Sequence, residues 1–221
     1  MLDYRSDIRD DAQTGETGVM SGLIEGTKVA TAIGWQRVET VTVGDRVLTF
    51  DRGLREVRAI RRVPLWTGAG HVPRRFRPLH VPKGAIGNTE DMIVLPRQGL
   101  MVESDAAEEA IGDPFPLVRA EALEGVCGIR RMNHASPFEV FVMQFDEDEI
   151  VFTSTGALCV CAAAGDMIQR LYSAQETIAY RLLSDETDSP LIDEIRYEIA
   201  AAAMAGDTRV APQPYADSRV A

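Results

Sequence analysis

The chain has 221 residues, of which 23 are basic and 34 acidic, giving a formal net charge of −11, and 45% of its residues are hydrophobic. This length suits one domain with extensions or two small domains, and the acidic balance argues against nucleic-acid or anionic-membrane binding, because both need clustered positive charge. The first twenty residues lack a basic start followed by an apolar run, and no stretch approaches the roughly 18 apolar residues of a membrane span, so we expect a cytoplasmic protein, with non-classical export left open.

The N-terminal part of the chain divides into a tail and a β domain. Residues 1–20 are polar and acidic, without apolar periodicity, which indicates a flexible tail. Residues 21–163 consist of short β-branched runs separated by turn residues, which is typical of an all-β domain. The predicted strands span residues 29–31, 37–41, 46–50, 56–60, 62–65, 79–81, 91–95, 100–102, 138–145 and 150–153. Residues 104–112 are expected to form a loop or a short exposed helix.

The C-terminal part changes to helical periodicity. Apolar residues from Met167 to Leu183 follow helical spacing, and a second helix is predicted with Ser189 as its cap and Pro190 at its first position. The sequence therefore predicts a two-helix extension over residues 164–206 and a flexible tail over 207–221. Isolated helices of this length are marginal in water, so the helical pair of residues 166–206 must cover its own seam, pack on the β domain or bind a partner protein.

The cysteines and histidines predict no metal site and no cofactor. The chain has three of each: Cys127, Cys159, Cys161, His71, His80 and His134. An odd, sparse set of cysteines is not a disulfide framework, and the ligand spacings of a tetrahedral metal site are missing. The cysteines are expected to be small buried hydrophobic residues.

Residues 22–31 read GLIEGTKVAT, and residues 34–49 read GWQRVETVTVGDRVLT. This opening resembles that of a Hint module, the self-cleaving domain shared by hedgehog proteins and inteins. Weaker similarities to bacterial members follow in the family's order over residues 57–62, 93–102, 117–123 and 141–152. The resemblance covers about residues 22–160 and implies a pseudo-symmetric, all-β Hint fold, here followed by the helical pair.

The resemblance also implies where the chemistry of self-cleavage would lie. In the family, a Cys or Ser four residues before the Gly-Thr pair attacks the preceding carbonyl, and a histidine helps to protonate the leaving amide. The nucleophile position is Gly22, which has no side chain, and one family histidine aligns with Gln98. Two further family histidines align with Val142 and Asp148. The reacting positions are therefore substituted.

Several interpretations follow from this conflict between scaffold and chemistry. The first is a Hint scaffold that has lost self-processing and now acts in binding or structure, so that enzyme activity is not expected. The second is an active autoprocessing domain that uses Ser21, one residue before the aligned position, as nucleophile. The third is an interaction module that binds a protein through its C-terminal helices. An error of alignment would make Gly22 an ordinary loop glycine.

Overall fold

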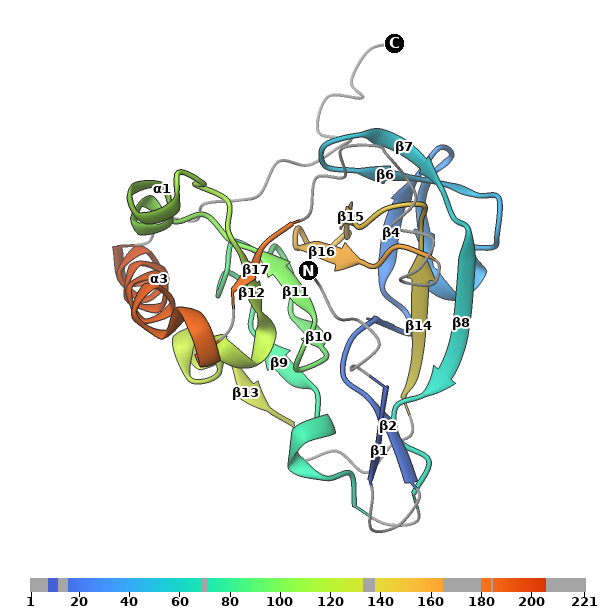
Figure 1. The fold of residues 1–221 in the computed structure, drawn as a ribbon, viewed down its shortest axis with the longest axis horizontal. Helices are drawn as coiled ribbons and strands as arrows, with labels where there is room; N and C mark the ends of the chain where they lie inside the picture. Colours follow the sequence, from blue (N-terminus) through green and yellow to red (C-terminus); the bar gives the residue numbers. More distant parts are fainter. Residues whose placement is uncertain are drawn as a thin grey trace.

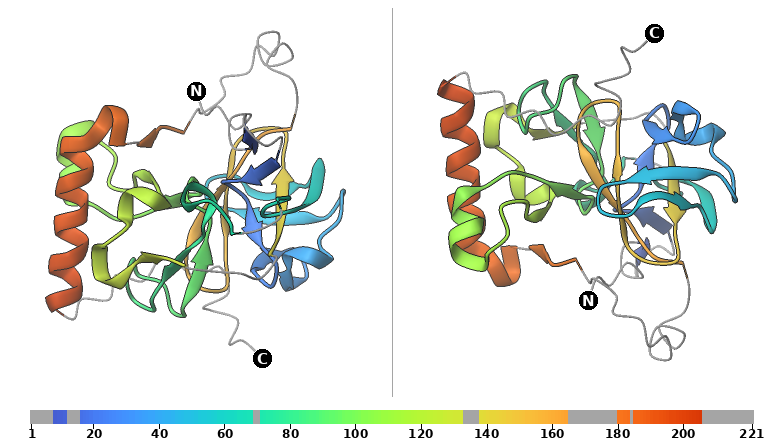
Figure 2. Two further views of the ribbon diagram at one scale, coloured as in Figure 1. Left: turned by 90° about the horizontal axis from the view of Figure 1, so that it is seen from below. Right: turned by 90° about the horizontal axis from the view of Figure 1, so that it is seen from above.

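The computed structural model describes residues 8–11, 16–68, 71–132, 138–164, 180–183 and 185–205. Within them, short strands form several sheets and helices lie along one side (Figures 1 and 2). The strands are β1 (Ile8–Asp11), β2 (Glu16–Val19), β3 (Leu23–Ile24), β4 (Lys28–Thr31), β5 (Gly34–Arg37), β6 (Arg46–Thr49), β7 (Gly53–Glu56), β8 (Ala59–Pro64), β9 (Leu79–Val81), β10 (Met92–Val94), β11 (Gly99–Met101), β12 (Leu117–Arg119), β13 (Arg130–Arg131), β14 (Glu139–Gln144), β15 (Glu149–Phe152), β16 (Leu158–Cys161) and β17 (Leu182–Leu183). The α-helices and 3-10 turns are η2 (Val38–Thr40), η3 (Arg74–Phe76), α1 (Asp105–Ile111), η4 (Ala120–Leu123), η5 (Val126–Gly128) and α3 (Asp185–Ala205). The mainly β architecture predicted from the sequence is confirmed.

Three sheets position the site. The largest has the order β17-β12-β11-β16-β15-β6-β4-β5, with β7 paired to β6, and the smaller two have the orders β10-β9-β13 and β3-β14-β8. The hairpin of β1 and β2 is separate. Fully buried side chains such as Val29, Leu79, Leu100 and Phe145 fill the space between the sheets, and burial of each large aliphatic side chain stabilises the fold by roughly 1.5–3 kcal/mol.

The strand predicted over residues 37–41 is wrong beyond Arg37. Only Arg37 belongs to a strand, and the chain then turns through η2. Local hydrogen bonds favour this turn: the Thr40 hydroxyl donates to the Arg37 carbonyl at 2.7 Å, and the Val41 N–H donates to the Val38 carbonyl at 3.2 Å. A threonine side chain that bonds to nearby backbone offers an alternative to a strand ladder, which the β-branched composition did not reveal.

The N-terminal segment is more ordered than predicted. Residues 8–11 and 16–19 pair as an antiparallel hairpin, whereas residues 1–7 and 12–15 lie outside the described residues. The hairpin is anchored by Val19, which is 3% exposed and whose N–H donates to the Leu65 carbonyl at 3.0 Å. The flexible tail predicted over residues 1–20 is therefore wrong for β1 and β2.

In the C-terminal extension, the second predicted helix is confirmed, whereas the predicted end of the first helix is wrong. Most of the first predicted helix lies outside the described residues, since residues 165–179 are not described. Leu182 and Leu183, predicted to end that helix, form β17, which pairs in parallel with β12. The second predicted helix is present as α3, and a break at Asp188 (φ −122°, ψ 19°) precedes the predicted start at Ser189.

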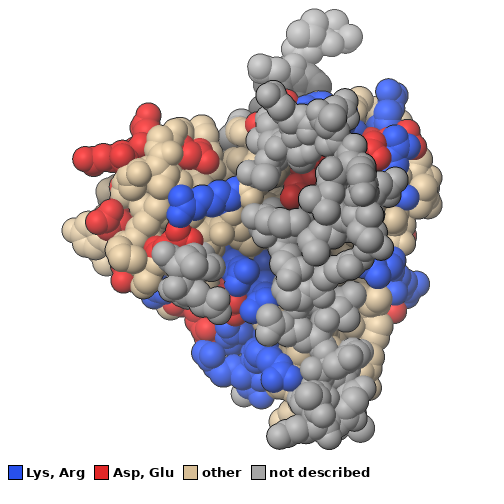
Figure 3. All heavy atoms as spheres, viewed as in Figure 1, with Lys and Arg blue, Asp and Glu red and all other residues tan. Residues whose placement is uncertain are grey.

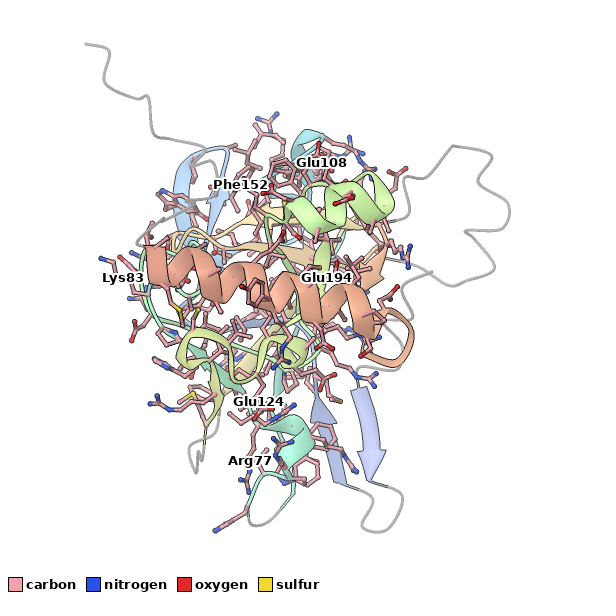
Figure 4. All side chains as sticks on the ribbon, turned by 90° about the vertical axis from the view of Figure 1, so that its left-hand side faces the viewer. Arg77, Lys83, Glu108, Glu124, Phe152 and Glu194 are labelled. Carbon is pink, nitrogen blue, oxygen red and sulfur yellow. The ribbon has the colours of Figure 1, made fainter. Side chains whose placement is uncertain are left out.

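Helix α3 packs on the β domain (Figure 4). Ile192 and Ile195 on its inner face are 1% and 0% exposed. The Glu198 carboxylate accepts hydrogen bonds from the Ala106 N–H at 2.9 Å and the Ser104 hydroxyl at 2.5 Å. Glu198 therefore supports the start of α1 and fixes α3 to the rest of the domain.

Candidate functional site

The candidate site lies where the chain enters β3. The backbone there is held by Arg97, whose N–H donates to the Met20 carbonyl at 2.8 Å. Ser21 follows with 4% exposure, and Gly22 leads directly into the strand. The turn that holds Arg97 and Gln98 precedes β11, so the sheet of β11 and β16 supports one wall of the site.

Gly22 has a backbone conformation and surroundings that only glycine fits. Its φ is +132°, a value that L-residues rarely adopt. A Cβ atom added there would lie 2.7 Å from Cγ1 of Val140 and 3.2 Å from the carbonyl oxygen of Phe141. The space that a nucleophilic side chain would need is therefore filled by β14.

Gln98 joins Ser21, Gly22 and β16 through one carboxamide that is 1% exposed. Its Oε1 accepts from the Gly22 N–H at 3.0 Å and from the Ser21 hydroxyl at 3.5 Å. Its Nε2 donates to the Val160 carbonyl at 2.8 Å and to the Gly99 carbonyl at 3.1 Å. Both ends of the amide are satisfied, and a carboxamide has no proton to exchange near neutral pH. Gln98 holds the chain in place and cannot act as an acid or a base.

Asp148 lies in a different environment, between β14 and β15. Its side chain is buried, and Oδ1 accepts a hydrogen bond from the Ala163 N–H at 2.9 Å. The structure brings Ser21, Gly22 and Gln98 together by direct hydrogen bonds, whereas the hydrogen bond of Asp148 ties the turn between β14 and β15 to the segment after β16. A catalytic role for any of the four positions remains a prediction.

A pocket of about 460 Å³ opens beside Gly22 and Gln98. One wall is β3 with residues 25–28, and another is β10 with Glu90 and Asp91. Apolar side chains, among them Ile24, Ile93 and Phe138, line much of it. Sequence reasoning missed this pocket, because its walls come from segments far apart in the chain and no motif marks them.

One pair of titratable groups at the pocket, His80 and Asp91, is held in position by contacts. Nε2 of His80 lies 3.1 Å from Oδ2 of Asp91, and the Lys83 N–H donates to Oδ1 at 2.8 Å. These two contacts, that of Lys83 first, hold the pKa of the Asp91 carboxyl below its usual value. Nδ1 of His80 is buried and has no hydrogen-bond partner in the described structure, so no ligand reaches it without movement. The pair shapes the wall of the pocket.

The thiols are equally unsuited to nucleophilic chemistry. Cys159 lines the pocket but is 3% exposed, and burial raises the pKa of its thiol to about 12. Burial also raises the pKa of Cys161 well above its usual value. Because the thiolate is the reactive form, neither group serves as a nucleophile near neutral pH.

Part of the positive charge on the surface is paired. Figure 3 shows basic side chains gathered beside acidic ones at the end of the molecule that holds η3. There Arg74 and Arg131 contact Glu124 at 2.9 and 2.8 Å. Within the described residues, no group of three or more His, Cys, Asp or Glu side chains is placed to hold a metal ion. No described helix has the length and apolar character needed to cross a bilayer.

Comparisons with known proteins give one family and several distant structures. The family model described as "Hint domain" matches residues 21–160. Among solved structures, an AceL NrdHF class 3 split intein is 18% identical, with 65% of this chain and 99% of that chain covered and a TM-score of 0.40. A bacterial intein-like domain from Clostridium thermocellum is 15% identical, with 65% and 99% covered and a TM-score of 0.44. No curated protein matches the chain.

Proposed function

This chain belongs to the Hint domain family, and we propose that its Hint domain has lost self-cleavage and now acts by binding. The observation that carries the proposal is the backbone conformation of Gly22 and the packing around it. Its φ of +132°, and the 2.7 Å that would separate Val140 from a Cβ atom at this position, leave no room for the cysteine or serine that the reaction needs. A missing nucleophile removes most of the rate of such a reaction, because its steps act as a unit.

Gln98 supports the same proposal, because its side chain cannot transfer a proton. General acid catalysis needs a group that gives up a proton near the working pH, and a carboxamide does not. The Gln98 side chain bonds to three backbone groups and to the Ser21 hydroxyl. The position has become part of the framework of the domain.

The alternative nucleophile, Ser21, has a poor environment for activation. Its hydroxyl is buried and its contact with Oε1 of Gln98 is long, at 3.5 Å. An amide oxygen accepts a hydrogen bond but is too weak a base to deprotonate a hydroxyl. Autoprocessing at the Met20–Ser21 bond is therefore the less supported function.

Binding through the C-terminal helices is also less supported. The inner face of α3 is used by the domain itself, through Ile192, Ile195 and the contacts of Glu198 with α1. Its outer face exposes Tyr197 and Met204, at 76% and 89%. Two exposed apolar side chains are common on soluble helices and do not define an interface.

Intact-mass measurement tests the loss of self-cleavage. Purified full-length chain is incubated with and without hydroxylamine or a thiol, reagents that trap an ester or thioester intermediate. We expect one mass, that of the uncleaved chain, under all conditions. A fragment that starts at Gly22 would contradict the proposal. A fragment that starts at Ser21, and that disappears in Ser21→Ala, would establish the alternative.

A further inference from the structure

We propose that the C-terminal tail of the chain, residues 206–221, occupies the pocket beside Gly22 and Gln98 in the same molecule. The inference rests on the proposed binding function and names what is bound. Three observations carry it: a motif that the tail repeats, the place where α3 ends, and the charges at the pocket. The tail enters the pocket by its side chains, so it needs no free strand edge.

The tail repeats one short motif. Residues 207–211 read DTRVA and residues 217–221 read DSRVA, so the second copy differs from the first only in serine for threonine. The residues between the copies, PQPYA, contain two prolines, which disfavour a helix and keep the preceding residues extended. Two copies of one motif on a single segment raise its effective concentration at a nearby site.

The tail begins beside the loop that leads to the pocket. Helix α3 ends at Ala205, and its last turn borders a small cavity together with residues 84–87. Figure 4 shows Lys83 beside this end of the helix. The loop continues to Glu90, which lines the pocket and whose carbonyl accepts from the Asn88 carboxamide at 2.8 Å. The end of α3 and the wall of the pocket are therefore neighbouring parts of the fold.

The tail is long enough to reach the pocket. An extended chain spans about 3.3 Å per residue, so Arg219, which lies fourteen residues beyond Ala205, has a reach of about 46 Å. Glu90 lies three residues, or at most about 10 Å, beyond Gly87, which borders the cavity at α3. No second copy of the chain is needed to bring the motif to the pocket.

The charged residues at the pocket match those of the motif. Glu25, Glu90 and Lys28 line the pocket and are exposed. Within the residues that the structure describes, none of these three side chains makes an ion pair or a hydrogen bond. The remaining carboxylate, that of Asp91, is already held by its contacts. Glu25 and Glu90 therefore offer partners for the arginine of the motif, and Lys28 offers one for its aspartate.

The other long segments outside the described residues match the pocket less well in charge. Residues 1–7 and 165–179 each carry two acidic side chains and one basic, whereas the tail carries two of each. A segment tethered to the same molecule also acts at a high effective concentration, so the tail competes with any partner from outside. The pocket thus carries an internal ligand that such a partner must displace.

The alternation of the motif suits the arrangement of polar and apolar groups at the pocket. In an extended segment, successive side chains point to opposite faces, so Asp217 and Arg219 share one face and Val220 lies on the other. Ile24 and Met92 give the pocket a buried apolar lining, whereas its charged residues are exposed. Valine enters this lining while arginine and aspartate stay outside. The volume of about 460 Å³ lies within the usual range of ligand pockets, about 300–1,000 Å³.

Amide spectra of the isotope-labelled full-length chain test the proposal. Arg209→Gln with Arg219→Gln removes both arginines of the motif. The matched control, Gln213→Glu with Ala216→Glu, lowers the charge of the tail by the same amount between the two copies. We expect shift changes at Ile24 for the first variant and none for the control, because only the arginines contact the pocket.

A blocked peptide of the sequence DSRVA gives a second measurement. It should bind the variant without the two arginines at least about tenfold more tightly than the wild type, because the tail no longer competes. Glu25→Gln with Glu90→Gln, added to that variant, should abolish this gain. Glu109→Gln, on the exposed face of α1, should keep it.

Three results would overturn the inference: no shift difference at the pocket, equal affinity of the peptide for the two chains, or wild-type shifts at the pocket that vary with protein concentration. The last result would place the tail of a second copy in the pocket. Each is independent of the intact-mass result. A chain that fails these tests but stays uncleaved refutes the tail contact alone, whereas a chain that cleaves itself refutes the loss of self-processing.

Discussion

The two sides of the entrance to β3 differ in how their polar groups are used. On one side, the Gly22 N–H, the Ser21 hydroxyl and the Gln98 amide bond to one another and to the Val160 carbonyl. On the other side, the N–H of Ile24 faces a pocket of about 460 Å³. Only one residue, Leu23, lies between Gly22 and Ile24. The side that the family uses for chemistry is closed, and the neighbouring side is open.

If self-cleavage has been lost, as we propose, this difference is the way in which the scaffold keeps its pocket while its reaction centre closes. In that proposal, two residues close the reaction centre: Gly22, which packs under Val140, and Gln98, which stands where a family histidine aligns and accepts from the Gly22 N–H. Neither change fills the pocket, whose walls come from β3 and β10. Changes on the closed side should therefore cost stability, whereas changes at the rim of the pocket should not.

The largest effect is expected for Gly22→Cys, which restores the family's nucleophile. The strained φ costs on the order of 1–3 kcal/mol and overpacking against Val140 a similar amount, so we expect a loss of about 3–5 kcal/mol in the free energy of unfolding. Thermal and urea denaturation measure it. Gly26→Ala is the control, because its φ is +84° and nothing lies within 4 Å of the added Cβ. That control should lose only about 1 kcal/mol. Equal losses would show that space at Gly22 is not limiting.

A smaller loss is expected for Gln98→Ala. It leaves the Gly22 N–H and the Val160 carbonyl without their buried partner, which costs about 2–3 kcal/mol. Gln98→Glu sharpens the test, since it keeps an acceptor for Gly22 but places a carboxylate against the two carbonyls that Nε2 now serves. A wild-type denaturation midpoint for both variants would mean that the amide does not hold the chain.

Asp148 should behave as a structural residue outside this comparison. Asp148→Ala removes the acceptor for the Ala163 N–H and should lower the free energy of unfolding by about 1–2 kcal/mol. Asp148→Asn keeps an acceptor oxygen and should stay close to wild type. If the asparagine variant lost as much stability as the alanine variant, the charge of Asp148 would matter more than its hydrogen bond.

The smallest effect is expected for the thiol that borders the pocket. With the pKa of Cys159 raised to about 12 by burial, its thiolate is scarce near neutral pH, so an alkylating reagent should leave it unmodified in the folded chain. The unfolded chain provides the control and should be modified at all three cysteines. Peptide mapping by mass spectrometry identifies the sites. Fast labelling of folded Cys159 would show that this wall of the pocket opens.

The sequence predicted the β domain better than it predicted either end. Alternating or continuous apolar runs located β9, β10, β11, β14 and β15 to within about two residues, because those strands bury their own side chains. The hairpin of β1 and β2 was missed because its residues are polar and its anchoring depends on Leu65, far along the chain. Leu182 and Leu183 were assigned to a helix because pairing with β12 is not visible in a local pattern.

The sequence predicted part of the arrangement around Gly22, and a catalytic role for these residues stays a prediction. The family's spacing located Gly22 and Gln98, and the structure joins them by a hydrogen bond of 3.0 Å. The sequence could not show that Val140 fills the space that a side chain at position 22 would need, because Val140 lies in a strand more than a hundred residues later. The pocket was not predictable, because Ile24 and Ile93 meet only through the arrangement of two separate sheets.

Amide hydrogen exchange at Gly22 and Ile24, followed by NMR in the same sample, tests the contrast between the two sides most directly. The structure predicts that the Gly22 N–H exchanges slowly because it is bonded to the buried Gln98, and that this protection falls in Gln98→Ala. It predicts that the Ile24 N–H, which points away from β14, exchanges faster. Fast exchange at Gly22 in the wild type, or equal protection of the two amides, would contradict the account.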